Sequence, residues 1–122
     1  MERFDATLDH VGAFAKARDW DQFHTPRNLI LAATGEMGEL AELLQWVPDS
    51  EVVEWFEVSD NRLRFSHEMA DVLIYLMRLA QVVDIDLLGA VDSKLSLNES
   101  RYPADVARGS AAKYTAYQEP ES

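Results

Sequence analysis

Four acidic residues stand in two pairs within otherwise apolar stretches of the sequence. Glu36 and Glu39 lie three residues apart in GEMGELAELLQW, and Glu68 and Asp71 lie three residues apart in HEMADVLIYL. Residues at this spacing share one face of an α-helix. Each pair would therefore present two neighbouring carboxylates if its segment is helical.

A helical wheel places both pairs on the side that should face the core. The residues within about 60° of either pair are mostly apolar. Around Glu36 they are Leu29, Ala32, Ala33, Glu39, Leu40 and Leu43; around Glu68 they are Phe65, Asp71, Val72, Tyr75, Leu79, Val82 and Val83. Glu42 falls at the margin of the first stripe. Asp is also a poor helix former, so Asp71 stands in its helix against its local propensity.

Four ionised carboxylates in one partly buried place repel each other and lose hydration. Protonation, basic neighbours or a metal ion could offset this repulsion and the lost hydration. These helices carry few inward basic residues. Oxygen ligands without His or Cys suit Mg²⁺, and Mn²⁺ also fits. One such pair alone is more often a solvated helix face. Two pairs inside apolar stripes favour a metal site built from Glu36, Glu39, Glu68 and Asp71.

Four helices are expected to position these residues, over about 7–18, 25–46, 60–84 and 86–101. Apolar residues recur at helical spacing in each, and no segment predicts a strand, so the expected class is all-α. Residues 48–60 are expected to form an acidic connection with at most one short helical turn. Residues 1–103 would form one domain. Residues 104–122, with little periodic apolar content, would form a flexible C-terminal tail.

Turn and cap residues mark the helix ends. Thr25 followed by Pro26 is a favourable helix start, and Pro48 stops the same helix because the residue before proline is pushed out of the α region. Ser59 or Asp60 is expected to cap the third helix, and Asp86 the fourth. The third helix is apolar on nearly all sides, which predicts burial on most sides and self-association.

Composition excludes several classes of protein. The chain has 122 residues, 48% of them apolar, no cysteine and a net charge of −11. Such acidity disfavours binding to a nucleic-acid polymer, and the absence of cysteine excludes a disulfide framework or a thiolate metal site. No run of about 18 apolar residues predicts a membrane span. The acidic N-terminus does not resemble a signal peptide. A cytoplasmic protein is expected.

The sequence strongly resembles the MazG-like, all-α nucleoside triphosphate pyrophosphohydrolases. The resemblance covers roughly residues 14–103 and rests on RDWDQFHTPRNLILAATGEMGELAELLQW, HEMADVLIYLMRLA and DLLGAVDSKLSLNESRYP. The segments RDWDQFH and ELLQW point to the branch that acts on dCTP. The resemblance implies a four-helix bundle assembled as a homodimer or homotetramer. It also implies Mg²⁺-dependent hydrolysis of a nucleoside triphosphate to the monophosphate and pyrophosphate.

The resemblance also assigns site residues. Glu36, Glu39, Glu68 and Asp71 would be the catalytic metal ligands. The positions that match substrate-contacting residues are Trp20, Asp21, Gln22, Phe23, His24, Trp46 and Tyr75. Trp20, Phe23 and Trp46 could form an aromatic slot for the base, although each taken alone is more often a core or interface residue. His24 and Asn28 could bind the base edge or phosphates, or serve as local caps.

The fourth helix adds a candidate phosphate-binding face. Lys94, Asn98 and Arg101 are spaced to share one side of a helix, and Tyr102 follows. Cations and an amide suit phosphate oxygens. Taken alone this face would be solvated surface, but it matches the family motif K-x-x-x-N-x-x-R-Y.

Two departures from the family pattern bear on base preference. Val11 stands where mammalian relatives carry a His, with His10 beside it, and His67 stands where an acid is usual. The same chemistry on dUTP or on a damaged nucleotide therefore remains an alternative to dCTP. A different class of function also remains, a non-catalytic helical module whose apolar third helix binds a partner.

Overall fold

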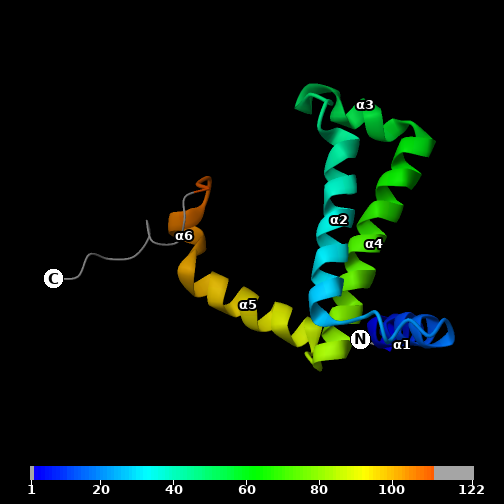
Figure 1. Cartoon of the computed structure of the whole chain (residues 1–122). Helices are drawn as coiled ribbons and strands as arrows, with labels where there is room; N and C mark the ends of the chain where they lie inside the picture. Colours follow the sequence, from blue (N-terminus) through cyan, green and yellow to red (C-terminus); the bar gives the residue numbers. More distant parts are fainter. Residues whose placement is uncertain (1, 112–122) are drawn as a thin grey trace. The chain divides into compact units, whose positions relative to one another are not determined.

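The structure is a computed structural model that describes residues 2–111. Its regular secondary structure is entirely helical in this range (Figure 1). The helices are α1 Glu2–Ala17, α2 Pro26–Leu44, the 3₁₀ turn η1 Asp49–Glu51, α3 Val52–Glu57, α4 Ser59–Val83, α5 Leu87–Arg101 and α6 Ala104–Ala107. No strand occurs in this range, which confirms the all-α prediction. The chain divides into two compact units, residues 1–84 and residues 85–122.

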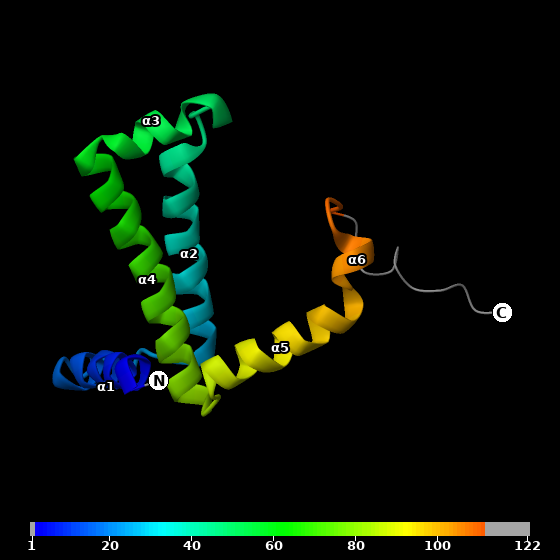
Figure 2. The same cartoon turned by 180° about the vertical axis from the view of Figure 1, so that it is seen from behind.

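The first unit is built on two long helices. In Figures 1 and 2, α2 and α4 run antiparallel side by side, α3 joins them at one end, and α1 crosses the other end. The side chains buried between these helices are apolar: Ala15, Leu29, Ala33, Met77 and Ala80. This small core holds α1, α2 and α4 together. Of the residues described, no helix is both long and apolar enough to cross a bilayer.

The start of α2 agrees with the prediction in detail. Thr25 is the N-cap, its hydroxyl accepts a hydrogen bond from the backbone N–H of Asn28 (3.2 Å), and Pro26 occupies the first turn. Satisfying one of the free N–H groups in this way stabilises a helix start. The helix ends at Leu44, two residues before the predicted end.

The other boundaries in this unit differ from those predicted. Helix α1 begins at Glu2 rather than near Thr7, with Glu2 and Asp5 in its first turn, where acidic side chains interact favourably with the helix dipole. The predicted cap of α4 was wrong, because Val58 is the N-cap and makes no side-chain bond. Instead, the Asn61 amide donates to the carbonyl of Trp55 (3.1 Å) and ties α3 to α4.

The acidic connection is more helical than predicted. It contains η1 and the six-residue α3. Trp55 and Phe56 of α3 pack edge-to-face with each other (5.0 Å between ring centroids) and with Phe65 of α4 (6.2 and 4.8 Å). Edge-to-face contacts between aromatic rings are favourable. This cluster fixes the end of the α2–α4 pair that lies away from α1.

Helix α4 is not buried on most of its sides within one chain. Met77 and Ala80 are buried, but Met69, Leu73 and Leu76 expose 54%, 48% and 41% of their surface. The apolar pattern of α4 therefore exceeds what the chain itself covers. Burial of this face by self-association stays a prediction.

The second unit consists of α5 and α6. Asp86 caps α5 as predicted, its carboxylate accepting from the backbone N–H of Gly89 (3.1 Å). Helix α6 is a single turn at Ala104–Ala107, inside the predicted tail. Residues 112–122 of the tail lie outside the described residues. The boundary predicted at residue 103 stays a prediction.

Candidate active site

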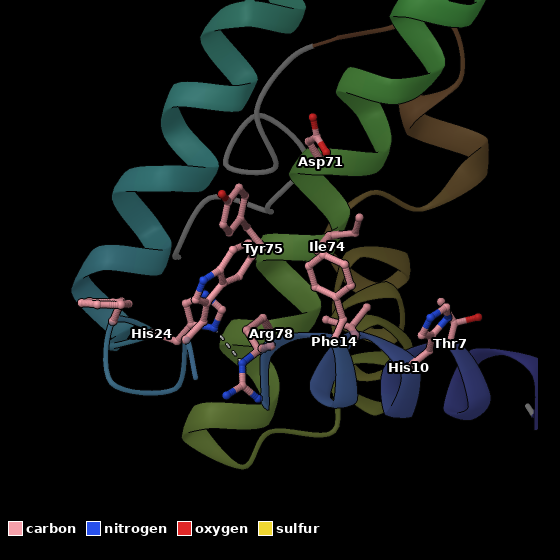
Figure 3. A pocket seen from close by; sticks show the side chains of 12 residues that line it. Thr7, His10, Phe14, His24, Asp71, Ile74, Tyr75 and Arg78 are labelled. Atoms are coloured by element: carbon pink, nitrogen blue, oxygen red, sulfur yellow. Dashed lines mark hydrogen bonds between the residues drawn. The ribbon is translucent and has the colours of Figure 1, made fainter. Parts of the chain in front are cut away.

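A pocket of about 630 Å³ opens between α1, the loop that precedes α2, and α4 (Figure 3). Its lining is mainly apolar and aromatic. The lining residues are Thr7, His10, Val11, Phe14, Ala15, Trp20, Phe23, His24, Asp71, Ile74, Tyr75 and Arg78. A concave, largely apolar site with a few polar groups is the usual form of a small-molecule site.

Aromatic rings form much of one side of the pocket. Phe14 and Trp20 meet edge-to-face with centroids 5.6 Å apart, and Trp20 meets His24 at 6.2 Å. Trp20 and Phe23 remain 42% and 59% exposed. Exposed aromatic faces beside a cavity are suited to stacking on a planar ligand.

The polar end of the pocket is organised by Arg78. Its Nε donates to Nδ1 of His24 (3.0 Å), and its Nη2 forms an ion pair with Oδ1 of Asp21 (2.6 Å). Its Nη1 donates to Oε1 of Gln81 (3.1 Å), whose Nε2 donates in turn to the carbonyl of Leu8 in α1 (2.7 Å). One guanidinium thus links α4, the loop before α2 and, through Gln81, α1.

The same contacts favour a neutral His24. Burial lowers the pKa of His24 below its usual value of 6.5, and the positive charge of Arg78 lowers it further. The negative charge of Asp21 acts in the opposite direction, as a smaller effect. Burial and a like charge both disfavour the protonated imidazole. His24 is therefore uncharged at neutral pH.

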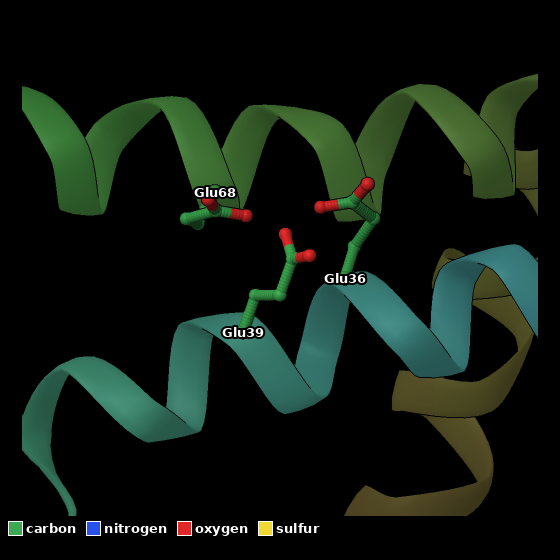
Figure 4. Close-up of side chains that lie close together, drawn as sticks. All are labelled: Glu36, Glu39 and Glu68. Atoms are coloured by element: carbon green, nitrogen blue, oxygen red, sulfur yellow. The ribbon is translucent and has the colours of Figure 1, made fainter.

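Three of the four predicted carboxylates meet beside this pocket. Glu36 and Glu39 project from α2 towards Glu68 on α4 (Figure 4). An oxygen from each lies within 4.8 Å of the others. The helical wheel predicted the faces that carry the two pairs, and the antiparallel packing of α2 on α4 brings Glu36 and Glu39 to the level of Glu68.

Two oxygens of this cluster have no hydrogen-bond donor among the described residues. Oε2 of Glu36 and Oε2 of Glu68 are buried without a hydrogen-bond partner. The pKa of Glu36 is raised to about 7, first by burial, then by the Glu39 and Glu68 carboxyls, which can share a proton with it, and by the charges of Glu39 and Asp71. Buried oxygens without donors are a deficit that a divalent cation would remove. The residues present therefore fit such a cation.

Asp71 lies between the cluster and the pocket. It does not belong to the group of three, but its charge contributes to the raised pKa of Glu36. Its side chain lines the pocket together with Tyr75, one turn further along α4 (Figure 3). The carboxylates and the pocket therefore form one continuous site in the first unit.

Several predicted site residues have other contacts. The amide of Gln22 donates to the carbonyl and the carboxylate of Asp19 (3.0 and 3.1 Å). The amide of Asn28 donates to the carbonyl of Phe23 (3.0 Å). Both therefore stabilise the loop before α2, and neither lines the pocket. Asp21 pairs with Arg78 rather than lining the pocket.

Trp46 is not part of the pocket. It is 85% exposed and follows the C-terminal end of α2, whereas Trp20 and His24 precede its N-terminal end. A helix of this length separates the two ends by about 28 Å. The predicted aromatic slot is therefore only partly present in one chain, with Trp20 and Phe23.

The predicted phosphate-binding residues lie in the second unit. Lys94, Asn98 and Arg101 belong to α5, and their spacing places them on one helical face. Tyr102 is the C-cap, and its backbone N–H donates to the carbonyl of Asn98 (2.7 Å). Their contact with substrate stays a prediction.

Sequence reasoning did not find Arg78 and Phe14. Arg78 is the single basic residue in the apolar run YLMRLA, and a charge in such a run is a signal that a buried partner exists. Phe14 has the helical spacing of an ordinary apolar residue of α1, and nothing in its type distinguishes it from a core residue. Val11 and His10 both line the pocket. The departure from the family pattern at Val11, where mammalian relatives carry a His, therefore lies in the pocket itself.

Comparisons relate the sequence and the fold of the chain to known proteins. The model of the MazG-like family matches residues 31–116. Over 102 residues the chain is 52% identical to dCTP pyrophosphatase 1 of Rattus norvegicus and of Homo sapiens, a match that covers 84% of this chain. The chain spans 60% of the length of these curated relatives.

A solved structure is also similar. The crystal structure of a pyrophosphatase from Archaeoglobus fulgidus superposes with a TM-score of 0.77 at 36% identity, covering 83% of this chain and 93% of that one. The similarity extends over nearly the whole of that fold. By its sequence match and its helical architecture, the chain is a member of the MazG-like family.

Proposed function

We propose that the chain is a Mg²⁺-dependent nucleoside triphosphate pyrophosphohydrolase, acting on dCTP or a modified dCTP. The observation that carries this proposal is the cluster of Glu36, Glu39 and Glu68, with buried oxygens lacking donors, beside an aromatic pocket. The pocket is suited to a base and the carboxylates to a cation that holds phosphates. Relatives named dCTP pyrophosphatase 1 support the choice of nucleotide.

Glu36, Glu39 and Glu68 would hold the divalent cation, with Asp71 adjoining them. A cation bound there supplies neutralisation of phosphate charge and Lewis-acid polarisation. Trp20 and Phe23 would hold the base, which fixes the triphosphate relative to the carboxylates. In the reaction, a water oxygen bonds to the α-phosphorus and the bond from that phosphorus to the bridging oxygen breaks. Pyrophosphate leaves with the bonding electrons, and a carboxylate oxygen accepts the proton of the water.

A nucleotide panel tests this proposal. The full chain is incubated with Mg²⁺ and each of dCTP, 5-methyl-dCTP, dUTP, dTTP and dATP, and monophosphate and pyrophosphate are measured separately. We expect equimolar monophosphate and pyrophosphate, with the highest kcat/KM for dCTP or its modified form. Orthophosphate release would contradict attack at the α-phosphorus. Preferential hydrolysis of dUTP would favour dUTP as the substrate. No hydrolysis of any nucleotide would favour the non-catalytic helical module.

We also propose that the chain self-associates through the apolar face of α4. Met69, Leu73 and Leu76 are substantially exposed in one chain, and exposed apolar patches of this kind usually mark an interface. If Trp46 contacts the base as predicted, it must belong to a neighbouring copy, because the length of α2 separates it from the aromatic end of its own pocket.

Leu73→Glu is expected to shift the chain from a dimer or tetramer towards a monomer, because it places a charge in the proposed interface. Light scattering coupled to size-exclusion chromatography measures the mass. Arg64→Glu changes an exposed residue of the same helix and is the control. A monomeric wild-type chain, or an unchanged mass for Leu73→Glu, would contradict the proposed interface.

A further inference from the structure

The guanidinium of Arg78 is held in one orientation by the fold. It bonds to His24 and Asp21 in the loop before α2 and to Gln81 on its own helix. Gln81 is fixed in turn by the Leu8 carbonyl. A Cβ at Gly12 would lie 3.0 Å from Nε2 of Gln81, so the glycine leaves room for this amide against α1. A planar group with three partners has little rotational freedom.

This orientation determines which nitrogen of His24 carries the proton. A guanidinium has donors and no acceptor, so Nδ1 of His24, which receives the bond from Arg78, must be unprotonated. In a neutral imidazole the other nitrogen, Nε2, is then the N–H donor. Within residues 2–111, Nε2 makes no hydrogen bond to the protein. His24 lines the pocket, so this donor is available to a ligand.

The position of His24 indicates which part of a nucleotide would meet it. Arg78 lies seven residues beyond Asp71 on α4, which is about 10 Å along the helix axis. Asp71 adjoins the carboxylate cluster, where phosphates would bind. His24 is instead in contact with Trp20, at the aromatic end of the pocket. A donor at this end faces the base rather than the triphosphate.

We propose that Arg78 is a positioning residue that holds His24 as an Nε2–H donor, and that this donor selects a base edge presenting an acceptor. The inference rests on the proposed function and adds a cause of base selection to it. Cytosine presents an unprotonated N3 and the O2 carbonyl, both acceptors. Uracil and thymine keep the O2 acceptor but present an N3–H donor in place of the first, so a donor distinguishes these bases only where it meets N3. A donor fixed opposite N3 therefore favours cytosine, because a donor left opposite another donor is unpaired in the complex.

Nitrogen-15 NMR of the imidazoles tests the first step without any nucleotide. The full chain has three histidines, and His24→Gln identifies the signals of His24. We expect the Nε2–H tautomer at neutral pH in the wild type. In Arg78→Met the tautomers should mix and the pKa of His24 should rise, because the cation is lost while Asp21 remains. An Nδ1–H tautomer in the wild type would overturn the proposal.

Kinetics test the second step. Arg78→Met is expected to reduce the ratio of kcat/KM for dCTP to that for dUTP by about 10-fold or more, mainly through KM for dCTP. Arg78→Lys, which keeps a donor and the charge, should recover part of the ratio. Arg64→Met on the exposed part of α4 should leave it unchanged. An equal loss with both nucleotides would show a merely structural role and overturn the proposal.

Two further measurements keep the proposal testable if Arg78→Met does not fold or the chain hydrolyses nothing. His24→Gln replaces the fixed donor by an amide, which can present either its NH₂ donor or its carbonyl acceptor. This variant should also show no preference for dCTP over dUTP. Deoxycytidine and deoxyuridine are titrated into the wild type without metal, with pyrophosphate as a third probe. Deoxycytidine should shift the Nε2 signal of His24 most strongly. A shift with pyrophosphate alone would overturn the assignment to the base edge.

Discussion

Glu39→Gln is expected to lower kcat for nucleotide hydrolysis by about 100-fold or more, because it removes a charge that the proposed cation and its phosphates require. The same change should not destabilise the metal-free protein. Glu39 raises the pKa of Glu36 through a shared proton and through its charge, so the neutral amide relieves repulsion in the cluster. Initial rates with dCTP and Mg²⁺, and the Tm in EDTA, measure the two effects.

The matched control for this variant is Glu42→Gln. Glu42 lies one turn further along α2, is exposed and does not belong to the group of three carboxylates. Its replacement should leave both the Tm and the rate within about twofold of the wild type. Full turnover by Glu39→Gln would exclude the proposed metal site. A large fall in its metal-free Tm would show that Glu39 is needed for folding instead.

Saturating Mg²⁺ is expected to stabilise the protein, and more strongly at pH 8 than at pH 6. A ligand at 100 times its Kd adds about 2.7 kcal/mol to the free energy of unfolding when it binds only the folded state. Protons compete for the same carboxylates, because the pKa of Glu36 is about 7 in the metal-free fold. Thermal unfolding with and without Mg²⁺ at the two pH values measures this difference.

The metal-free protein should show the opposite dependence on pH. The pKa of Glu36 is raised in the fold from its usual 4.5 to about 7, so the folded state binds more protons than the unfolded state between these values. The contribution of Glu36 to the free energy of unfolding is then fully present below pH 4.5 and is lost as the pH rises through 7. Glu36→Gln should flatten this dependence. Equal stability of the metal-free wild type at pH 5 and pH 8 would contradict the raised pKa.

Helical periodicity was sufficient to predict which faces of α2 and α4 carry the clustered carboxylates. Glu36, Glu39 and Glu68 lie in apolar stripes whose spacing depends only on local helix geometry, and two antiparallel helices must turn such stripes towards each other. The Thr25 and Asp86 caps were predicted for a similar reason, since a cap depends on a few adjacent residues. The resemblance to the MazG-like family added the nucleotide chemistry, which periodicity could not supply.

The contacts of Arg78 could not be predicted in this way. Asp21 and His24 are more than fifty residues away in the chain, and nothing local to YLMRLA indicates which loop packs against it. Side-chain partners at such separations follow from how α1, α2 and α4 pack. The amides of Gln22 and Asn28 are used in local loop bonds that compete with a ligand. For Asn28 this agrees with the local role that the sequence left open beside substrate binding.

An all-α chain, the caps of α2 and α5, and the helix faces that carry the two carboxylate pairs follow from the sequence alone, because helix period and capping are local properties. The packed chain buries these carboxylates only in part, and Glu39 is exposed. Tertiary packing alone decided that the cluster holds three carboxylates with Asp71 beside it, that Trp46 lies away from the aromatic end of the pocket, and that Arg78 bonds His24. Each of these depends on distances between elements that are remote in sequence. Only the packed helices define those distances.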